Sequence, residues 1–319
     1  MTTPSKPRIA ISSCLLGEKV RYDSGHKHNR YITGTLGEYF DFVPLCPEVA
    51  VGLGIPRPTI RLVVRDGEVR ARAQSDETLD PTDELRDYGR KMASQIEGKV
   101  CGYLLKKDSP SCGMERVKVF DKPNAPAKRE GVGIYAREIL SLLPDLPVEE
   151  EGRLMDPGLR ENFVERVFTY DRWLKFLDED FTPAGLVKFH TCHKFFILAH
   201  DETTYRELGR IVADVGKGDL VDTAATYASL LMQGLKKQAT PRKNANVLQH
   251  MMGFFKYDLD SHDQQELLNA IELHRQRLVP AIVPITLINY FRRKYRNAYI
   301  DDQVYLEPHP PELMLRNHI

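Results

Sequence analysis

The hydrophobic pattern of this 319-residue chain changes once, near residue 150. Before that point, short apolar runs alternate with segments of helical period. After it, apolar residues recur at helical spacing almost to the end. Alternating strands and helices are typical of an open, mostly parallel α/β sheet, whereas an uninterrupted helical pattern is typical of a bundle. The pattern therefore predicts an N-terminal α/β domain followed by a C-terminal all-α helical domain.

Residues 144–152 mark the predicted boundary between the two domains. This segment is rich in proline and acidic residues and has no apolar period, as expected of a linker. We therefore assign residues 1–146 to the α/β domain and residues 155–319 to the helical domain. The chain is about twice as long as a typical single domain, so each part can hold its own core.

Apolar runs and turn residues locate the elements of the first domain. The dipeptide Asp66-Gly67 favours a two-residue hairpin turn, which makes the strands on either side of it antiparallel neighbours. Two helices are predicted at 83–96 and 134–143, the first from an early proline and the second from a preceding glycine. The predicted strands are 8–12, 41–45, 60–64, 68–72 and 100–105.

Capping signals locate helices in the second domain. Thr182-Pro183 and Thr240-Pro241 each place an N-cap before a proline in the first helical position. Ser261, with Gln264 three residues later, predicts a capping box that opens a helix at 262–278. A last long helix is predicted at 284–296. In all, about seven helices and no strand are expected, which is typical of a bundle.

Three cysteines lie where predicted strands give way to turns: Cys14, Cys46 and Cys112. In open α/β sheets ligands bind beyond the carboxyl ends of the strands, so these thiols share one expected location. Their separations of 32 and 66 residues exceed those of a zinc knuckle or a ferredoxin-type run. Three thiolates also leave a four-coordinate centre one ligand short, and substrate binds at such a position. The pattern predicts a catalytic metal centre.

The other two cysteines do not lie at the ends of predicted strands. Cys101 falls inside a predicted strand, so we interpret it as a core residue. Cys192 lies on a predicted helix near His190, His193 and His200, which suggests a second metal site. Adjacent positions on a helix point about 100 degrees apart, however, so a structural role is favoured.

Bulk composition predicts a cytoplasmic protein. No apolar stretch approaches the roughly 20 residues that cross a bilayer, and the first residues lack a signal-peptide core. We therefore expect no membrane association. Five cysteines in a reducing compartment indicate thiols or metal ligands rather than disulfides. The formal net charge is zero and indicates nothing about partners.

The distribution of basic residues along the chain says more about possible partners than the net charge does. Segments 223–257 and 273–300 contain lysines and arginines but no acidic residue, and the second also carries several tyrosines. Basic stretches interleaved with aromatic residues are typical of a phosphate-binding face. A solvated helix surface is the alternative interpretation.

Three sequence blocks resemble the thiouracil desulfidase family. They are Ser13 to Gly17 with Arg21-Tyr22-Asp23, Cys46-Pro47-Glu48 with Gly52-Leu53-Gly54, and Ser109 to Gly113. The resemblance covers residues 8 to 143. It implies a small α/β domain that holds a 4Fe-4S cluster through Cys14, Cys46 and Cys112 and removes sulfur from a thiolated pyrimidine. Thiolate ligands suit an iron-sulfur cluster or zinc.

The second half is similar to a helical domain often fused to that family. Its matching blocks are Lys188-Phe189-His190, Ala199-His200, Arg242 to Leu248, and Tyr305 to Pro310. The fused arrangement implies action on 4-thiouridine in tRNA. Free 2-thiouracil or a thionucleoside is an alternative substrate. A zinc-stabilised RNA-binding protein without catalysis is an alternative of another class.

Polar residues beside the cysteines are candidate catalytic groups. Glu48 can accept and donate the protons of hydrolysis, or it can cap a helix that begins at Pro47. Ser109 and Ser111 can orient substrate or water, or they can simply close a turn. The resemblance favours Ser109. Asp23 can bind the pyrimidine edge or order the loop around the first cysteine.

If the base belongs to tRNA, it must leave its stack to reach a recessed site. Flipping costs a few kcal/mol, which phosphate contacts can offset. The candidate phosphate contacts beside the site and in the helical domain are Lys19, Lys27, Arg30, Lys236, Lys237, Arg242, Lys243, Arg292, Arg293 and Arg296.

Overall fold

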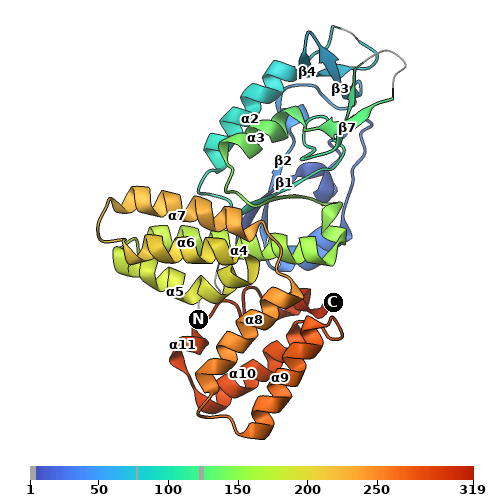
Figure 1. The fold of residues 1–319 in the computed structure, drawn as a ribbon. Coiled ribbons are helices and arrows are strands. Elements are labelled where there is room, and N and C mark those ends of the chain that lie inside the picture. Colours follow the sequence, from blue (N-terminus) through green and yellow to red (C-terminus); the bar gives the residue numbers. More distant parts are fainter. Residues whose placement is uncertain (1–4, 77, 122–125) are drawn as a thin grey trace. The chain divides into compact units, whose positions relative to one another are not determined.

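The computed structural model describes residues 5–76, 78–121 and 126–319. The chain divides into two compact units, Met1–Met155 and Asp156–Ile319 (Figure 1). The first unit combines strands with helices, and the second is helical. This confirms the predicted fold class, an α/β part followed by an all-α part. None of the described helices is both long and apolar enough to span a membrane.

A wholly parallel four-stranded sheet forms the centre of the first unit, in the order β2-β1-β5-β8. Ile9 on β1 lies opposite Phe42 on β2 and opposite Gly102 on β5. Side chains 9–11 and 103–105 of the two middle strands are completely buried, as expected of strands covered on both faces. The strands are β1 (Arg8–Ser12), β2 (Asp41–Leu45), β5 (Gly102–Leu105) and β8 (Val148–Glu150).

A second four-stranded sheet, of mixed direction, has the order β4-β3-β6-β7. Asp66 and Gly67 both have positive φ, 51° and 82°, and join β3 to β4 as an antiparallel hairpin, as predicted. The sequence did not indicate β6 or β7, which have only four residues each, and β7 is polar. The strands are β3 (Ile60–Arg65), β4 (Glu68–Ala73), β6 (Val117–Phe120) and β7 (Lys128–Gly131).

Two helices of the first unit, α2 (Thr82–Ile96) and α3 (Ile134–Leu142), lie side by side (Figure 1). Gly89 allows their close approach, because a Cβ there would lie 2.8 Å from the Cβ of Glu138. The buried residues of α2 recur at helical spacing and face the core. Both helices match their predicted positions to within one residue.

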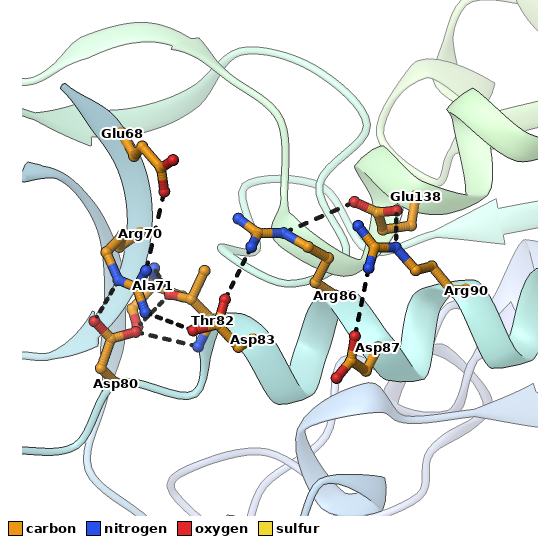
Figure 2. A network of polar contacts seen from close by, with 10 residues as sticks. All are labelled: Glu68, Arg70, Ala71, Asp80, Thr82, Asp83, Arg86, Asp87, Arg90 and Glu138. Atoms are coloured by element: carbon orange, nitrogen blue, oxygen red, sulfur yellow. Dashed lines mark hydrogen bonds and ion pairs between the residues drawn. The ribbon is translucent and has the colours of Figure 1, made fainter.

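Polar contacts hold the amino end of α2 against the exposed edge of β4 (Figure 2). The buried Thr82 hydroxyl accepts a hydrogen bond from the Ala71 N–H at 2.8 Å and donates one to the Ala71 carbonyl at 3.4 Å. Arg70 forms ion pairs with Asp80 at 2.7 Å and with Asp83 at 2.9 Å. These contacts satisfy the backbone groups of an edge strand that no neighbouring strand covers.

The predicted linker at 144–152 is wrong, because part of it is strand β8 of the central sheet. The division between the units falls after Met155, so the first unit extends beyond the predicted end at residue 146, while the helical unit begins within one residue of its predicted start at 155. β8 contains two acidic residues and so lacks the apolar signature of a buried strand. Its carboxylates are paired instead: Glu149 accepts from Arg153 Nε at 2.6 Å, and Glu150 accepts from the Met114 N–H at 2.7 Å.

The second unit has no strand among its described residues, and seven of its helices span at least twelve residues. Thr182 and Thr240 are the predicted N-caps, each accepting a backbone N–H. The capping box at Ser261 is wrong, since Asp260 is the N-cap there. The helices are α4 (Pro157–Glu179), α5 (Pro183–His200), α6 (Glu202–Ala213), α7 (Leu220–Leu235), α8 (Pro241–Met252), α9 (Ser261–Arg275), α10 (Ile282–Tyr295) and α11 (Ala298–Asp301).

The histidines near Cys192 belong to the core of the second unit. His190 Nδ1 lies 3.0 Å from the Tyr227 hydroxyl, and His193 Nδ1 lies 2.7 Å from the Phe189 carbonyl. Burial lowers the pKa of His193 to about 3, so its imidazole is neutral. Among the described residues, no three His, Cys, Asp or Glu side chains form a group that could hold a metal ion.

Replacing Thr82 by valine leaves the N–H and carbonyl of Ala71 without their partner. We expect the free energy of unfolding, measured by urea denaturation, to fall by about 1–3 kcal/mol. The control is Arg90→Ala on the same helix, which removes only half-exposed ion pairs and is expected to cost at most about 1 kcal/mol. Equal losses in the two variants would contradict the role assigned to Thr82.

Candidate active site

A cavity of about 350 Å³ in the first unit is lined by Cys14, Cys46 and Cys112. Cys14 follows β1, Cys46 follows β2, and Cys112 lies in the loop that follows β5. These strands are parallel neighbours, so their carboxyl ends meet at one edge of the sheet. The structure therefore brings together the three cysteines that the sequence singles out. Cys101 is buried and does not line the cavity.

The three thiols are largely removed from solvent. Cys14 and Cys112 are 8% and 6% exposed, and Cys46 is partly buried. Burial raises the pKa of Cys14 to about 11, although nearby Lys106 opposes this effect, and burial also raises the pKa of Cys46 and Cys112. The thiols therefore carry protons at neutral pH, and a cationic centre that takes them as thiolates must displace those protons.

The thiols line the cavity as separate groups. They share one cavity, and among the described residues no three His, Cys, Asp or Glu side chains form a group that could hold a metal ion. A tetrahedral zinc needs all its ligands around one point. An iron-sulfur cluster binds its thiolates through different irons, so its ligands are spread more widely.

Glu48 lies at the start of the short helix α1 (Pro47–Ala50) and lines the cavity. Arg57 donates to its Oε2 atom from Nε at 2.9 Å and from Nη2 at 2.5 Å. The Arg57 side chain is only 3% exposed, and it also donates to the carbonyls of Val20 and Gly54. This pair holds the carboxylate in one orientation.

Ser111 connects Glu48 with the third cysteine. Its hydroxyl donates to Glu48 Oε1 at 2.6 Å and lies 3.6 Å from Cys112 Sγ. Because that hydrogen is used, the Ser109 hydroxyl, 3.0 Å away, is the donor to Ser111. Ser109 Oγ also accepts the Cys112 N–H at 3.1 Å. A hydrogen-bonded chain thus runs from Arg57 to the loop that carries Cys112.

Asp23 does not line the cavity. Its side chain is half exposed; Oδ1 accepts the Gly25 N–H at 3.0 Å and lies 3.6 Å from Arg21 Nε. That backbone hydrogen bond lowers the pKa of Asp23. These contacts favour the second interpretation of Asp23, in which it orders the loop after Cys14. The neighbouring Arg21 and Tyr22 do line the cavity.

Two cavity residues of clear chemical interest were not predicted. Lys106 lines the cavity and forms an ion pair with Glu151, which also accepts the Lys107 N–H at 2.8 Å. Arg57 lies between two prolines in Ile55-Pro56-Arg57-Pro58, and this rigid setting was a signal that could have indicated it.

The predicted phosphate contacts have different surroundings. In the first unit, Lys27 lines the cavity, whereas Lys19 and Arg30 are exposed elsewhere in the nearby loop. In the second unit, Lys237 is paired with Asp201 at 2.8 Å and Arg292 with Glu307 at 2.8 Å.

The predicted contacts of the second unit differ in their exposure to solvent. Lys243 is partly buried and donates to the carbonyl of His200 at the end of α5. The exposed members of the predicted set in this unit are Lys236, Lys237, Arg242, Arg293 and Arg296.

Comparison with known proteins identifies two families. Residues 9–151 match the family model described as 2-thiouracil desulfurase, and residues 194–310 match a model described as a protein of unknown function, DUF1722. The uncharacterized protein YbgA of Escherichia coli strain K12 is 30% identical over 153 residues, which cover 48% of this chain and 90% of YbgA.

A solved structure also matches by sequence. The [4Fe-4S]-dependent thiouracil desulfidase TudS is 30% identical, and the match covers 47% of this chain and 95% of that chain with a TM-score of 0.37. The N-terminal unit of the chain belongs to the 2-thiouracil desulfurase family, and the helical unit carries a DUF1722 domain.

The buried ion pair between Arg57 and Glu48 is expected to stabilise the first unit. Replacing Arg57 by methionine leaves the Glu48 carboxylate buried without a cation, which should lower the free energy of unfolding by about 3–5 kcal/mol. A second change, Glu48→Gln, should then restore part of the loss. Urea denaturation of the wild type, both single variants and the double variant measures the coupling. Purely additive effects would contradict a direct pair.

Proposed function

We propose that this protein is a desulfidase that hydrolyses the C=S group of a thiolated uracil. Water supplies the oxygen, the C–S bond breaks, and the products are uracil and hydrogen sulfide, with no net electron transfer. The observation that carries the proposal is the shared cavity of Cys14, Cys46 and Cys112 beside the hydrogen-bonded Glu48 and Ser111. Membership of the 2-thiouracil desulfurase family supports it.

Cys14, Cys46 and Cys112 would hold a 4Fe-4S cluster. Their thiolates are soft ligands suited to iron-sulfur centres, and all three line one cavity. When bound, an iron without a protein ligand would supply a Lewis acid for the sulfur of the substrate.

Glu48 and Ser111 would move the protons of the reaction. Ser111 donates to Glu48 Oε1 at 2.6 Å, so it can pass its hydrogen to that carboxylate while it accepts one from the attacking water. Glu48 then returns this proton to the departing sulfur. As the C–S bond breaks and the C=O bond forms, Glu48 takes the remaining proton of the added hydroxyl through Ser111 and passes it to the sulfur, which leaves as hydrogen sulfide. Arg57 occupies Oε2, which leaves Oε1 as the basic atom.

We propose that the uracil belongs to tRNA in the cytoplasm. Arg21, Lys27 and Lys106 give the cavity a cationic lining that suits a phosphate-bearing substrate. In the helical unit, the exposed Arg242, Arg293 and Arg296 are available for backbone phosphates. Such contacts can offset the few kcal/mol needed to flip the base out of its stack.

Removing one proposed ligand tests the cluster. Protein purified without oxygen should be brown and contain about four irons, as a 4Fe-4S centre requires. Cys46→Ala should lose most of that iron and the release of sulfide from thiolated uracil, whereas Cys192→Ala, a cysteine outside the cavity, should retain both. Iron analysis and sulfide detection are the measurements.

Two outcomes would overturn the proposed chemistry. One is a Cys46→Ala variant with full iron content and full sulfide release. The other is a colourless wild-type protein with one zinc and no sulfide release, which would favour the zinc-stabilised RNA-binding alternative.

Substrate preference is tested by supplying 4-thiouridine in tRNA, free 4-thiouridine and free 2-thiouracil to the iron-loaded enzyme. We expect the ratio kcat/KM to be highest for tRNA and to fall steeply as salt rises from 50 to 200 mM, because phosphate contacts release counterions. Replacing both Arg242 and Arg293 by glutamate should raise KM for tRNA at least tenfold and leave the free substrates unaffected.

The matched control for that variant is Lys217→Glu, which changes an exposed lysine paired with Asp214 outside both basic stretches. If the free base is the better substrate and salt has no effect, the free-thiouracil alternative replaces tRNA.

A further inference from the structure

The helical unit contains a polar cavity that the proposed desulfidation does not use. It has a volume of about 380 Å³ and lies between the start of α4, the start of α8, the end of α9 and residues near 316. All its lining residues belong to the second unit. Its volume is in the range of small-molecule sites.

Arg316 and Glu165, which both line this cavity, form an ion pair with each other. Arg316 Nη2 donates to Glu165 Oε1 at 3.0 Å, and His200 Nε2 lies 3.5 Å from Glu165 Oε2. All three side chains are buried. We therefore assign this pair a structural role and do not count its atoms among the groups that contact a ligand.

Two hydrogen-bond acceptors in the cavity are not satisfied. The Glu161 carboxyl group lies 3.8 Å from Arg316 Nε and 3.5 Å from His318 Nδ1, and neither contact is a hydrogen bond among the described residues. Burial raises the pKa of Glu161 to about 8, so the group holds a proton at neutral pH and its other oxygen remains an acceptor. His274 is 4% exposed, and its Nε2 atom is buried without a partner. Its Nδ1 lies 3.0 Å from the Val279 carbonyl, so Nδ1 carries the hydrogen and Nε2 is an acceptor.

Two hydrogen-bond donors are also available. Arg277, at the end of α9, lines the cavity, is exposed and has no ion pair within the described ranges. The Asn244 carbonyl oxygen accepts the Tyr305 hydroxyl at 3.2 Å, which orients its NH₂ group as a donor. The cavity thus combines unmet acceptors with unmet donors. Its ligand must carry both kinds of group.

We infer that this cavity binds the guanine base of a nucleotide. Guanine has N1–H and N2–H₂ donors on one edge, which suit the acceptor oxygen of Glu161 and His274 Nε2. Its O6 and N7 acceptors suit the guanidinium of Arg277, a pairing common in nucleic-acid recognition. Uracil has a single ring N–H, and adenine and cytosine each have a single amino group, so they match fewer of these atoms. Where the nucleotide is part of RNA, the inference rests on the proposed function.

The test is calorimetric binding of guanosine monophosphate to the full-length, iron-loaded protein, compared with the adenosine, cytidine and uridine monophosphates. We expect the guanine nucleotide to bind at least tenfold more tightly than the others. Glu161→Leu and Arg277→Ala should each weaken it about tenfold, the effect of one lost hydrogen bond. Glu266→Gln, an exposed glutamate on α9, should not change it.

Arg277 is exposed, so its variant should fold even if Glu161→Leu does not. Equal affinity for the four nucleotides, no binding of guanosine monophosphate, or an unchanged affinity in Arg277→Ala would overturn the inference. Competition between guanosine monophosphate and tRNA distinguishes a nucleotide in RNA from a free one. The readout is binding rather than sulfide release, so this inference and the desulfidase proposal fail independently.

Discussion

The parallel pairing of β1 with β2 and β5 is the constraint on which the candidate active site depends. Ile9 lies opposite Phe42 and Gly102, and this register places the residues after each strand at one edge of the sheet. The register is held by complete burial of the middle strands, because a slip of one residue would turn every side chain to the other face. The position of the cysteines is therefore a consequence of core packing rather than of any attraction between thiols.

Buried charges in the first unit are compensated one by one. Arg57 pairs with Glu48, Lys106 with Glu151, and Arg153 with Glu149, and each carboxylate accepts at least one further hydrogen bond or faces the cavity. Unpaired, such groups would cost several kcal/mol each. The Arg153–Glu149 pair makes the acidic strand β8 compatible with a sheet, whereas the Arg57–Glu48 and Lys106–Glu151 pairs orient side chains that line the cavity. Paired charges thus contribute both to stability and to the proposed chemistry.

In the helical unit, tertiary packing determines which basic side chains are paired with acidic residues and which are not. Its two acid-free stretches are basic in sequence, yet Lys237 and Arg292 are paired with acids that lie on other elements. The exposed arginines that remain, such as Arg242 and Arg293, are the ones suited to phosphates. The same unit encloses a cavity with unmet donors and acceptors, so it combines a basic surface with a specific pocket. The proposed binding of RNA would use both features.

Local signals in the sequence determined the fold class, the hairpin at Asp66-Gly67, the helix caps at Thr182 and Thr240, and the strand-end placement of the cysteines. Each depends on a few neighbouring residues, which is why sequence alone predicts it. Tertiary structure decided the rest: β8 as a strand, Arg57 as the partner of Glu48, and Asp23 as a loop residue. These depend on which distant side chains meet, and ion pairs and registers across the fold leave no local pattern to detect.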